Sequence, residues 1–344
     1  MFGLTSGAQT FFLLFILCVI IILSTGMGYI KIPPFFVLKI IASKIIGNPE
    51  ILKGIDNIFP FVVLEVRLPR MLTSAIVGAG LSISGVIFQG ILLNPLADPY
   101  TLGISAGAAF GASIALFLNI NIFGIYSVLM FAFIGAVITL FTVMSLSSFN
   151  GQMSSNNLVL SGIIIASILS AGISFIKYMA DEQVSIIIFW LMGSFTSMTW
   201  INVCSTLLFV LIGFFISIFF ARDLNIMSLG DRSAGSMGVE TNKVRITLLV
   251  TASLITAICV SVSGIIGFVG LIVPHLMRFF VGPDNRKLFP VCAIVGAILL
   301  LIADTTTRAV LPKEIPIGVL TALFGGPFFC FIFRQKTLPG NTNG

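Results

Sequence analysis

The residues with the clearest potential for chemistry are charged side chains that lie between two long apolar runs. The interval 221–245 holds seven of the chain's thirty Asp, Glu, Lys and Arg residues, namely Arg222, Asp223, Asp231, Arg232, Glu240, Lys243 and Arg245. Charge at the centre of a bilayer is costly, so this interval must lie in water. Its side chains can form ion pairs and hydrogen bonds with a partner. The interval is therefore either an ordinary solvated loop or a docking surface.

Two short helices are predicted inside this interval. Residues 225–229 come before Gly230, and residues 231–237 come before Gly238. Each stretch begins with a polar residue and ends at glycine, which is the usual asymmetry of helix ends. If the interval is a docking surface, these two helices form it.

Side chains for catalysis or metal binding are sparse. His275 is the only histidine, which excludes a multi-histidine metal site, and the five cysteines stand singly in apolar runs. The sequence holds no G-x-x-x-x-G-K-[ST] phosphate loop, so any ATP hydrolysis must occur on another chain. We expect no catalytic site, no metal site and no cofactor. His275 is expected to be structural, with a proton relay or a metal ligand as the alternative.

The composition is that of an integral membrane protein. Of 344 residues, 58% are hydrophobic and 9% are charged, whereas about a quarter are charged in soluble domains. At ~20 apolar residues per helical span, the chain has room for roughly ten spans. The net charge of +6 is usual for basic aqueous loops and does not indicate binding to nucleic acid. We therefore predict an all-α integral membrane protein in which residues 1–344 form a single transmembrane domain.

The apolar segments divide the chain into ten predicted spans. They lie at about 10–31, 67–93, from 102 onward, 122–147, 156–178, 200–220, 244–264, 265–280, 290–307 and 316–334. Residues 32–66 are a part-polar connection that is interrupted by Pro33-Pro34 and Asn48-Pro49. A shorter apolar piece at 184–194 is predicted to be interfacial or re-entrant.

A four-residue glycine spacing marks the third span. Gly103, Gly107 and Gly111 fall on one helical face, where a neighbouring helix backbone can approach closely. We expect this face to pack against another span.

A short internal repeat links the two halves of the chain. Residues 82–87 resemble residues 261–266, and each first serine is followed thirteen positions later by a proline, Pro95 or Pro274. By the span count, the two spans concerned run in opposite directions. This pattern predicts an inverted repeat, which is a frequent architecture of transporters.

The charge bias between the two faces does not fix the orientation. Nine Lys and Arg residues fall on the face that carries 221–245, and nine fall on the other face. The rule that positive loops stay inside therefore does not choose between the two topologies.

Taken together, the motifs of this sequence resemble one family, the FecCD-type permeases of ABC importers for ferric siderophores, haem and cobalamin. The matching segments are 67–70 (RLPR), 85–90 (GVIFQG), 94–99 (NPLADP), 102–108 (LGISAGA), 190–194 (WLMGS), 229–231 (LGD), 237–239 (MGV), 264–278 (GIIGFVGLIVPHLMR), 303–304 with Arg308, 314–318 (EIPIG) and 325–329 (GGPFF). They occur in family order between residues 67 and 334, and residues 1–60 add little.

The resemblance implies a type II ABC importer permease fold of ten helices in the inner (cytoplasmic) membrane, with both termini cytoplasmic. It implies a second permease chain, expected to be identical, two copies of an ATP-binding subunit and an external substrate-binding protein. It also implies a path along the dimer axis, lined mainly by the fifth and tenth spans and by parts of the third and eighth. In this sequence those spans are almost free of charge.

Under the same resemblance, residues 221–243 become a cytoplasmic coupling element that sits in a cleft of the ATP-binding subunit. The residues expected to serve this contact are Leu229, Gly230, Asp231, Arg232, Ala234, Gly238 and Glu240. Closure of the ATP-binding subunits would move the two helices as levers and rock the spans against each other, which is alternating access.

On the opposite face, Arg67, Arg70 and Arg308 match family arginines that receive acidic residues of the binding protein. Guanidinium groups can form bidentate pairs with carboxylates and steer an acidic partner. The alternative is that these arginines only snorkel at helix ends. Asp304 is expected to cap its helix or to pair with Arg308, four positions later on the same helical face.

The resemblance leaves the cargo open. Ferric siderophore is the first expectation, haem or cobalamin is the alternative, and a molybdate-type oxyanion is the last. An ion-coupled secondary transporter would need ionisable residues near mid-span, and a membrane enzyme would need a catalytic cluster at one interface. The sequence shows neither pattern, and both classes leave the 221–245 helices unexplained.

Overall fold

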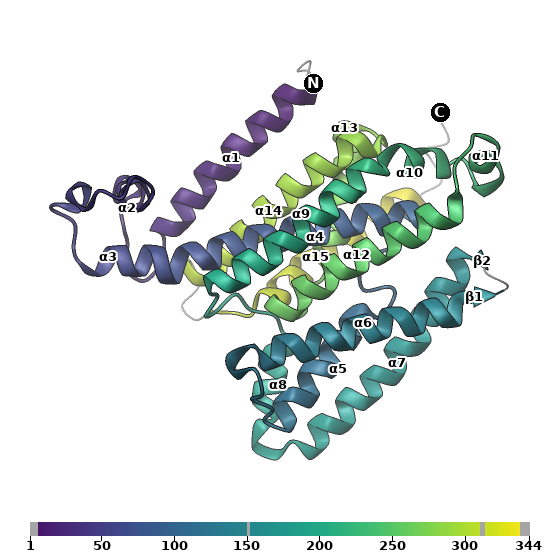
Figure 1. Cartoon of the computed structure of the whole chain (residues 1–344), viewed down its shortest axis with the longest axis horizontal. Helices are drawn as coiled ribbons and strands as arrows, with labels where there is room; N and C mark the ends of the chain where they lie inside the picture. Colours follow the sequence, from purple (N-terminus) through teal and green to yellow (C-terminus); the bar gives the residue numbers. More distant parts are fainter. Residues whose placement is uncertain (1–5, 150–151, 310–313, 338–344) are drawn as a thin grey trace.

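A computed structural model describes residues 6–149, 152–309 and 314–337, which form a bundle of helices (Figure 1). Six described helices are long and apolar enough to cross a membrane, and four shorter apolar helices accompany them. In chain order they match the predicted spans: α1 (Ser6–Gly26), α4 (Leu68–Ile91), α5 (Ile104–Phe117), α6 (Ser127–Ser147), α7 (Ser155–Met179), α9 (Trp200–Phe219), α12 (Thr241–Ser263), α13 (Val269–Val281), α14 (Asn285–Ala309) and α15 (Ile317–Thr337). The prediction of an all-α membrane protein is confirmed, and the ten predicted spans correspond to these six long and four shorter apolar helices.

Short elements connect these spans at both ends of the bundle. They are α2 (Pro34–Ile46), a 3₁₀ turn (Pro49–Leu52), α3 (Ile58–Phe61), a π-helical turn (Val62–Arg67), α8 (Val184–Leu191), α10 (Ala221–Met227), α11 (Asp231–Ser236) and a small hairpin of β1 (Ser148–Phe149) and β2 (Gln152–Met153). The interrupted connection predicted at 32–66 therefore contains a helix of its own. Its last part continues directly into α4, so that one helical run extends from Ile58 to Ile91.

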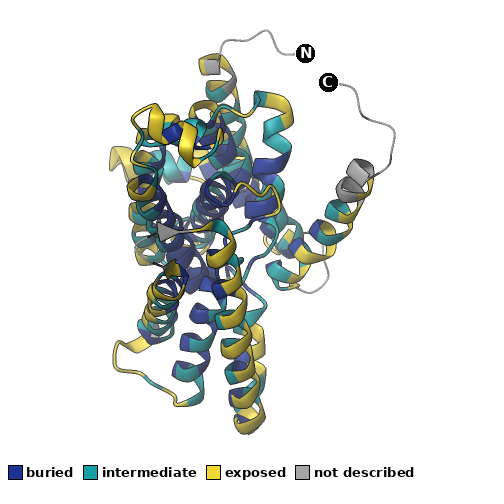
Figure 2. Cartoon of the chain, turned by 90° about the vertical axis from the view of Figure 1, so that its right-hand side faces the viewer, coloured by how far each residue is buried: buried dark blue, intermediate teal, exposed yellow. Residues whose placement is uncertain are grey.

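The centre of the bundle is the antiparallel pair α4 and α12. The Ser84 hydroxyl on α4 donates to the Ala252 carbonyl (3.1 Å), and the Cys259 thiol donates to the Val77 carbonyl (3.9 Å). Of the six long spans these two are the most enclosed. In their most apolar stretches 83% and 78% of the residues are buried, against 22% in α7. Figure 2 shows the buried residues gathered in the middle of the bundle. The outer spans therefore present their apolar side chains to lipid.

Glycines allow α4 to contact its neighbours through the backbone. A Cβ atom at Gly85 would lie 1.8 Å from the carbonyl oxygen of Gly270 in α13, and one at Gly78 would lie 2.2 Å from the carbonyl oxygen of Gly296 in α14. Small residues at such positions let helix backbones approach closely inside a membrane. α4 is thus the helix around which α12, α13 and α14 assemble.

The eighth span begins later than predicted. Gly264 (φ +71°) and Phe268 (φ +69°) have positive φ angles, so residues 264–268 are non-helical and α13 starts at Val269. The Tyr100 hydroxyl donates to the Ile266 carbonyl and accepts a hydrogen bond from the Ile266 amide (3.2 Å). This side chain satisfies backbone groups that lipid could not satisfy.

The short sequence repeat does not correspond to equivalent structure. Residues 82–87 lie within α4, whereas residues 261–266 cover the end of α12 and the non-helical segment. Pro95 lies in the turn after α4, and Pro274 lies inside α13. The two spans are antiparallel, as the inverted repeat predicts, while the six-residue motif lies inside a helix in one span and at a helix end in the other.

Candidate functional site

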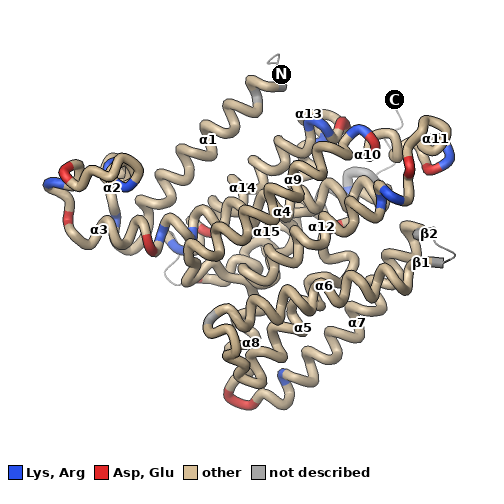
Figure 3. The backbone as a smooth tube through the Cα atoms, viewed as in Figure 1, with Lys and Arg blue, Asp and Glu red and all other residues tan. Residues whose placement is uncertain are grey.

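Charged side chains gather at the two ends of the bundle and are scarce along its middle (Figure 3). One end carries α10 and α11. The other end carries Arg67, Arg70 and Arg308. The candidate site therefore consists of two charged ends that an apolar body connects.

At the first end, α10 and α11 form the predicted helical pair. α11 matches the predicted stretch 231–237 to within one residue. α10 begins four residues before the predicted stretch 225–229 and ends two residues before its end. Gly230 (φ +96°, ψ +151°) precedes α11, and Gly238 (φ +85°) follows it. A Cβ atom at either position would meet nothing within 4 Å. The backbone conformation rather than space therefore requires glycine at these two bends.

An ion pair fixes α11 to the bundle. The Arg245 guanidinium on α12 donates to both carboxylate oxygens of Asp231, at 2.7 and 2.9 Å. The Arg245 side chain is only 9% exposed, whereas that of Asp231 is 54% exposed. Asp231 thus serves the chain's own arginine, and the orientation of α11 follows that of α12.

A hydrogen-bonded group fixes α10 in the same way. The Asn225 amide donates to Asp284 (2.7 Å), and its oxygen accepts from the backbone and side-chain amides of Asn285 (2.9 and 2.7 Å). Burial raises the pKa of Asp284, but hydrogen bonds from Asn225 and from the Arg286 amide outweigh it, so the pKa lies below its usual value. This charged carboxylate ties α10 to the start of α14.

The outward surface of the pair is exposed and mixed in character. Leu229 and Met237 are 64% and 59% exposed, and Arg232 and Glu240 are exposed beside them. Ala234 is fully buried, so it supports α11 from inside and offers no contact to a partner. Met237 belongs to the matched MGV segment but was not among the residues expected to serve this contact, although an apolar residue next to a bend glycine was the available signal.

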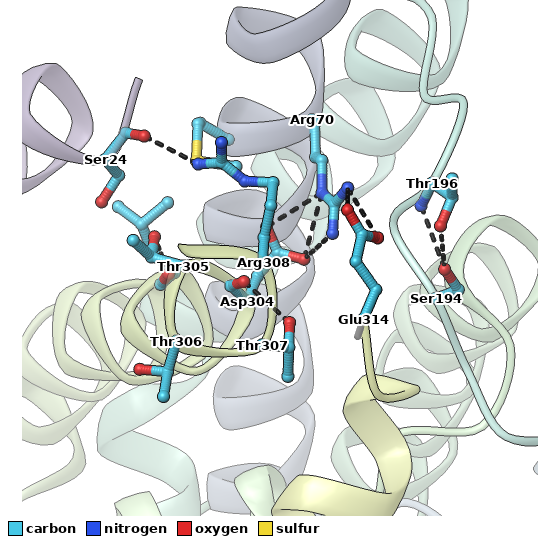
Figure 4. Close-up of polar contacts among 12 residues, drawn as sticks. Ser24, Arg70, Ser194, Thr196, Asp304, Thr305, Thr306, Thr307, Arg308 and Glu314 are labelled. Carbon is cyan, nitrogen blue, oxygen red and sulfur yellow. Dashed lines mark hydrogen bonds and ion pairs between the residues drawn. The ribbon is translucent and has the colours of Figure 1, made fainter. Parts of the chain in front are cut away.

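At the opposite end, Arg70 joins two acidic side chains (Figure 4). It donates to Asp304 at 2.9–3.2 Å and to Glu314 at 3.3–3.4 Å. The Asp304 side chain is 1% exposed and that of Glu314 is 48% exposed. Arg70 therefore has one buried, close partner and one looser partner at the surface.

Arg67 and Arg308 both bind the end of α1 and the residues just after it. Arg67 donates to the carbonyls of Thr25 (3.0 Å), Gly26 (3.1 Å) and Ile30 (2.6 Å). Arg308 donates to the carbonyls of Ser24 (2.8 Å) and Met27. The carbonyls of Ser24, Thr25 and Gly26 are among those that a helix end leaves without intrahelical partners. The two guanidinium groups thus cap α1.

The three arginines predicted to face a partner are all engaged within the chain. The predicted pairing of Asp304 with Arg308 is wrong, because Asp304 pairs with Arg70 and Arg308 turns to α1. The four-residue spacing along α14 suggested the wrong partner, since the closer cation comes from another helix. Glu314 was not singled out as a partner of these arginines, and only its place in the EIPIG motif could have indicated it.

The three glycines of the third span serve two different neighbours. Cβ atoms at Gly107 and Gly111 would lie 2.6 Å and 2.1 Å from the carbonyl oxygens of Gly135 and Phe131 in α6. Gly103 lies before α5, with φ +73°, and approaches Gly162 in α7. The expected single face is therefore divided between α6 and α7.

An apolar groove of about 580 Å³ runs between α13, α14 and α15. The described residues that line it include no charged side chain; they include Phe268, Ile272, Leu276, Ile302, Phe324 and Phe328. The outer face of α7 is also apolar, with Ile168 and Phe175 more than half exposed. Surfaces of this kind offer a large solute no strong polar anchor.

Comparisons with known proteins agree with this architecture. The chain matches the FecCD transport family over residues 15–335. It is 39% identical to the cobalamin import system permease protein of Halobacterium salinarum, over 82% of this chain and 76% of that protein. It is 36% identical to the molybdate import system permease protein of Haemophilus influenzae, over 98% and 96%. A solved metal-chelate type ABC transporter in an inward-facing conformation superposes with a TM-score of 0.83 at 32% identity, over 96% of this chain and 99% of that one.

The family match covers nearly all of the described bundle, including both charged ends. The solved relative shares the fold over 96% of this chain. Proteins of this family are permease subunits of ABC importers, which are transporters and not enzymes. The chain is therefore a multi-pass membrane protein that belongs to the FecCD transport family of ABC importer permeases.

Proposed function

We propose that this chain carries a metal chelate, foremost a ferric siderophore, across the inner membrane as one half of a homodimeric permease. Two copies of an ATP-binding subunit would supply the energy, and an external binding protein would deliver the cargo. The observation that carries the proposal is the exposed pair α10–α11, which ion pairs and hydrogen bonds fix to α12 and α14. A force applied to this pair passes directly into two spans.

We infer that both chain ends lie on the cytoplasmic side with α10 and α11. Gly7 and Thr10 of α1 line one small cavity together with Arg286 and Lys287, which follow the segment that Asn225 binds. Near the other end of the chain, the ring centroids of Phe329 in α15 and His275 in α13 are 6.5 Å apart. These contacts support the inference that both termini lie at the same end of the bundle as α10 and α11.

The apolar groove and the exposed apolar face of α7 favour a path that binds a bulky cargo only weakly, so that the cargo slides along it. Selection would then rest with the external protein. Cobalamin or haem is the alternative cargo, and the cobalamin relative named above supports the first of these. The molybdate relative makes an oxyanion the third candidate.

Transport by the reconstituted assembly tests this proposal. The chain would be placed in proteoliposomes with its ATP-binding subunit and its binding protein. ATP-dependent uptake of a radiolabelled ferric siderophore is expected, and cyanocobalamin or haemin should compete weakly. An ATP-binding subunit without its phosphate-loop lysine is the control and should abolish uptake. Uptake by the permease alone, driven by an ion gradient, would contradict the proposal.

We also propose that the arginine end receives the binding protein, with Arg70 as the arginine that changes partner. Arg67 is 7% exposed and caps α1, so reversing its charge would disturb the fold before it disturbed docking. Glu314, in contrast, holds Arg70 only through long contacts of 3.3–3.4 Å. An acidic side chain of the binding protein would displace Glu314 and leave the Arg70–Asp304 pair intact.

Replacing Glu314 by glutamine is expected to tighten docking. The change removes a competing charge from Arg70, and half-exposed ion pairs contribute about 0.2–1 kcal/mol, so the affinity for the binding protein should rise roughly 1.5- to 5-fold. The dissociation constant would be measured over a salt series, because the gain should shrink as salt screens the charges. Glu50→Gln is a matched control, since Glu50 pairs with the exposed Lys53. A weaker or unchanged affinity in Glu314→Gln would show that Glu314 does not compete.

A further inference from the structure

The helix α2 presents two unlike faces. Val37, Ile40 and Ser43 are buried, and the two apolar ones pack in a small cluster with Val63 of the π-helical turn. The other face is apolar too, yet exposed: the exposed fractions are 62% for Phe35, 47% for Leu38, 79% for Ile45 and 67% for Ile46. At 100° per residue these four side chains fall within one third of the helix circumference. The described part of the chain leaves this face uncovered.

The position of α2 indicates what covers this face. Figure 1 shows α2 at the edge of the molecule, beside the end of α1 and away from the main bundle. Ile22 near the end of α1 packs in the same cluster as α2. α1 itself exposes Phe11, Phe12 and Phe15, as expected for a helix that faces lipid. The exposed face of α2 therefore lies next to the end of a helix whose exposed side chains are those of a lipid-facing span.

The charges around α2 complement those of a membrane surface. Residues 31–46 contain Lys31, Lys39 and Lys44 and no acidic residue. Lys39 extends over the Phe35 ring, with its Nζ 4.8 Å from the ring centroid. The ammonium of Lys39 therefore lies beside the exposed apolar face, where a headgroup phosphate would meet it if that face entered a membrane surface. Anionic phospholipids would attract the basic segment further.

We propose that α2 is an interfacial helix: its exposed apolar face enters the membrane surface on the side opposite α10 and α11, and its lysines bind phospholipid phosphates. Through the shared cluster, the lipid surface would then hold the outer extension of α4, from Ile58 to Arg67, in place. This inference concerns the membrane contact of α2 and does not depend on the cargo or on the ATP-binding subunit.

Fluorescence quenching by brominated lipids tests the insertion. In full-length protein carrying Trp190→Phe and Trp200→Phe, single tryptophans would be introduced by Phe35→Trp, by Leu38→Trp and, as the control, by Glu50→Trp. Glu50 is exposed on the neighbouring 3₁₀ turn and has a 72% exposed side chain. In bilayers of phosphatidylcholine brominated near the headgroup end of the acyl chains, the two α2 tryptophans should be quenched at least about twofold more than the control, because interfacial helices place their apolar face at that depth.

The headgroup claim has its own measurement. Quenching of the Phe35→Trp protein by brominated phosphatidylglycerol should exceed quenching by brominated phosphatidylcholine in mixed bilayers. Lys39→Gln should reduce that preference, by up to roughly fivefold if the full attraction of one lysine to an anionic surface is lost. A preference unchanged in Lys39→Gln would remove the phosphate contact from the proposal.

Two outcomes would overturn the insertion of α2. Equal or absent quenching at the α2 positions and at Glu50→Trp would place the apolar face in water. The second outcome is that quenching is absent in bilayers and that the tryptophan emission of Phe35→Trp shifts to the blue only when the external binding protein is added. This result would make the face a protein docking surface. Using both Phe35→Trp and Leu38→Trp keeps the result from depending on one substitution, and both positions are exposed.

Discussion

Replacing Asp304 by alanine is expected to lower the free energy of unfolding by about 3–5 kcal/mol, because it leaves a buried arginine without its carboxylate. The Asp304 side chain is 1% exposed, and that of its partner Arg70 is 11% exposed. The pair also joins α14 to the start of α4, the helix on which the bundle is built. Glu314 cannot compensate, since its contacts to Arg70 are longer and lie at the surface.

The measurement is chemical or thermal unfolding of the purified protein in detergent micelles. Glu314→Ala is the matched control, because it removes the second carboxylate from the same arginine and should cost about 1 kcal/mol or less. The double variant Arg70→Met with Asp304→Asn should recover much of the loss, since no buried charge is then unpaired. A loss in Asp304→Ala that is no larger than that in Glu314→Ala would show that the pair does not stabilise the bundle.

The spans were predictable because their physical cause is local. Any run of about 20 apolar residues between polar ones must form a helix in lipid, and α6, α7 and α9 lie within a few residues of their predicted bounds. The same holds for α11, whose ends are set by Gly230 and Gly238. The extent of α4 was not predictable in this way, because the π-helical turn that ends at Arg67 joins a part-polar segment to the span without a break.

Contacts between distant residues were out of reach. Arg70 and Asp304 are 234 positions apart. The sequence spacing therefore indicated Arg308 as the partner of Asp304 and gave no sign of Arg70. Likewise, the capping of α1 by Arg67 and Arg308 depends on backbone carbonyls, which have no signature in the residue types. The two copies of the six-residue motif, at 82–87 and 261–266, differ in local structure for a related reason. Their neighbours differ, and the second copy lies beside Gly193, whose lack of a Cβ atom permits the close approach to Ile265.

Replacing Gly230 by alanine is expected to uncouple ATP hydrolysis from transport in the assembled importer. At φ +96° and ψ +151°, a residue with a Cβ atom bears about 1–3 kcal/mol of strain. If the chain relieves that strain by turning α11, the productive orientation becomes roughly 5- to 150-fold less populated, since each 1.4 kcal/mol is a factor of ten. Uptake should fall accordingly while the protein still inserts, because no atom lies within 4 Å of the added methyl group.

The matched control is Gly235→Ala, which lies inside α11, has ordinary helical backbone angles and would also meet nothing within 4 Å. Uptake and ATPase rates would be measured together in proteoliposomes, and their ratio is the informative quantity. Gly230→Ala should lower the number of cargo molecules moved per ATP, whereas Gly235→Ala should leave it unchanged. The same ratio should fall in Asp231→Asn, which weakens the link from α11 through Arg245 to α12. If both Gly230→Ala and Asp231→Asn kept the normal ratio, then α11 would not transmit force, and another contact at this end of the bundle would have to do so.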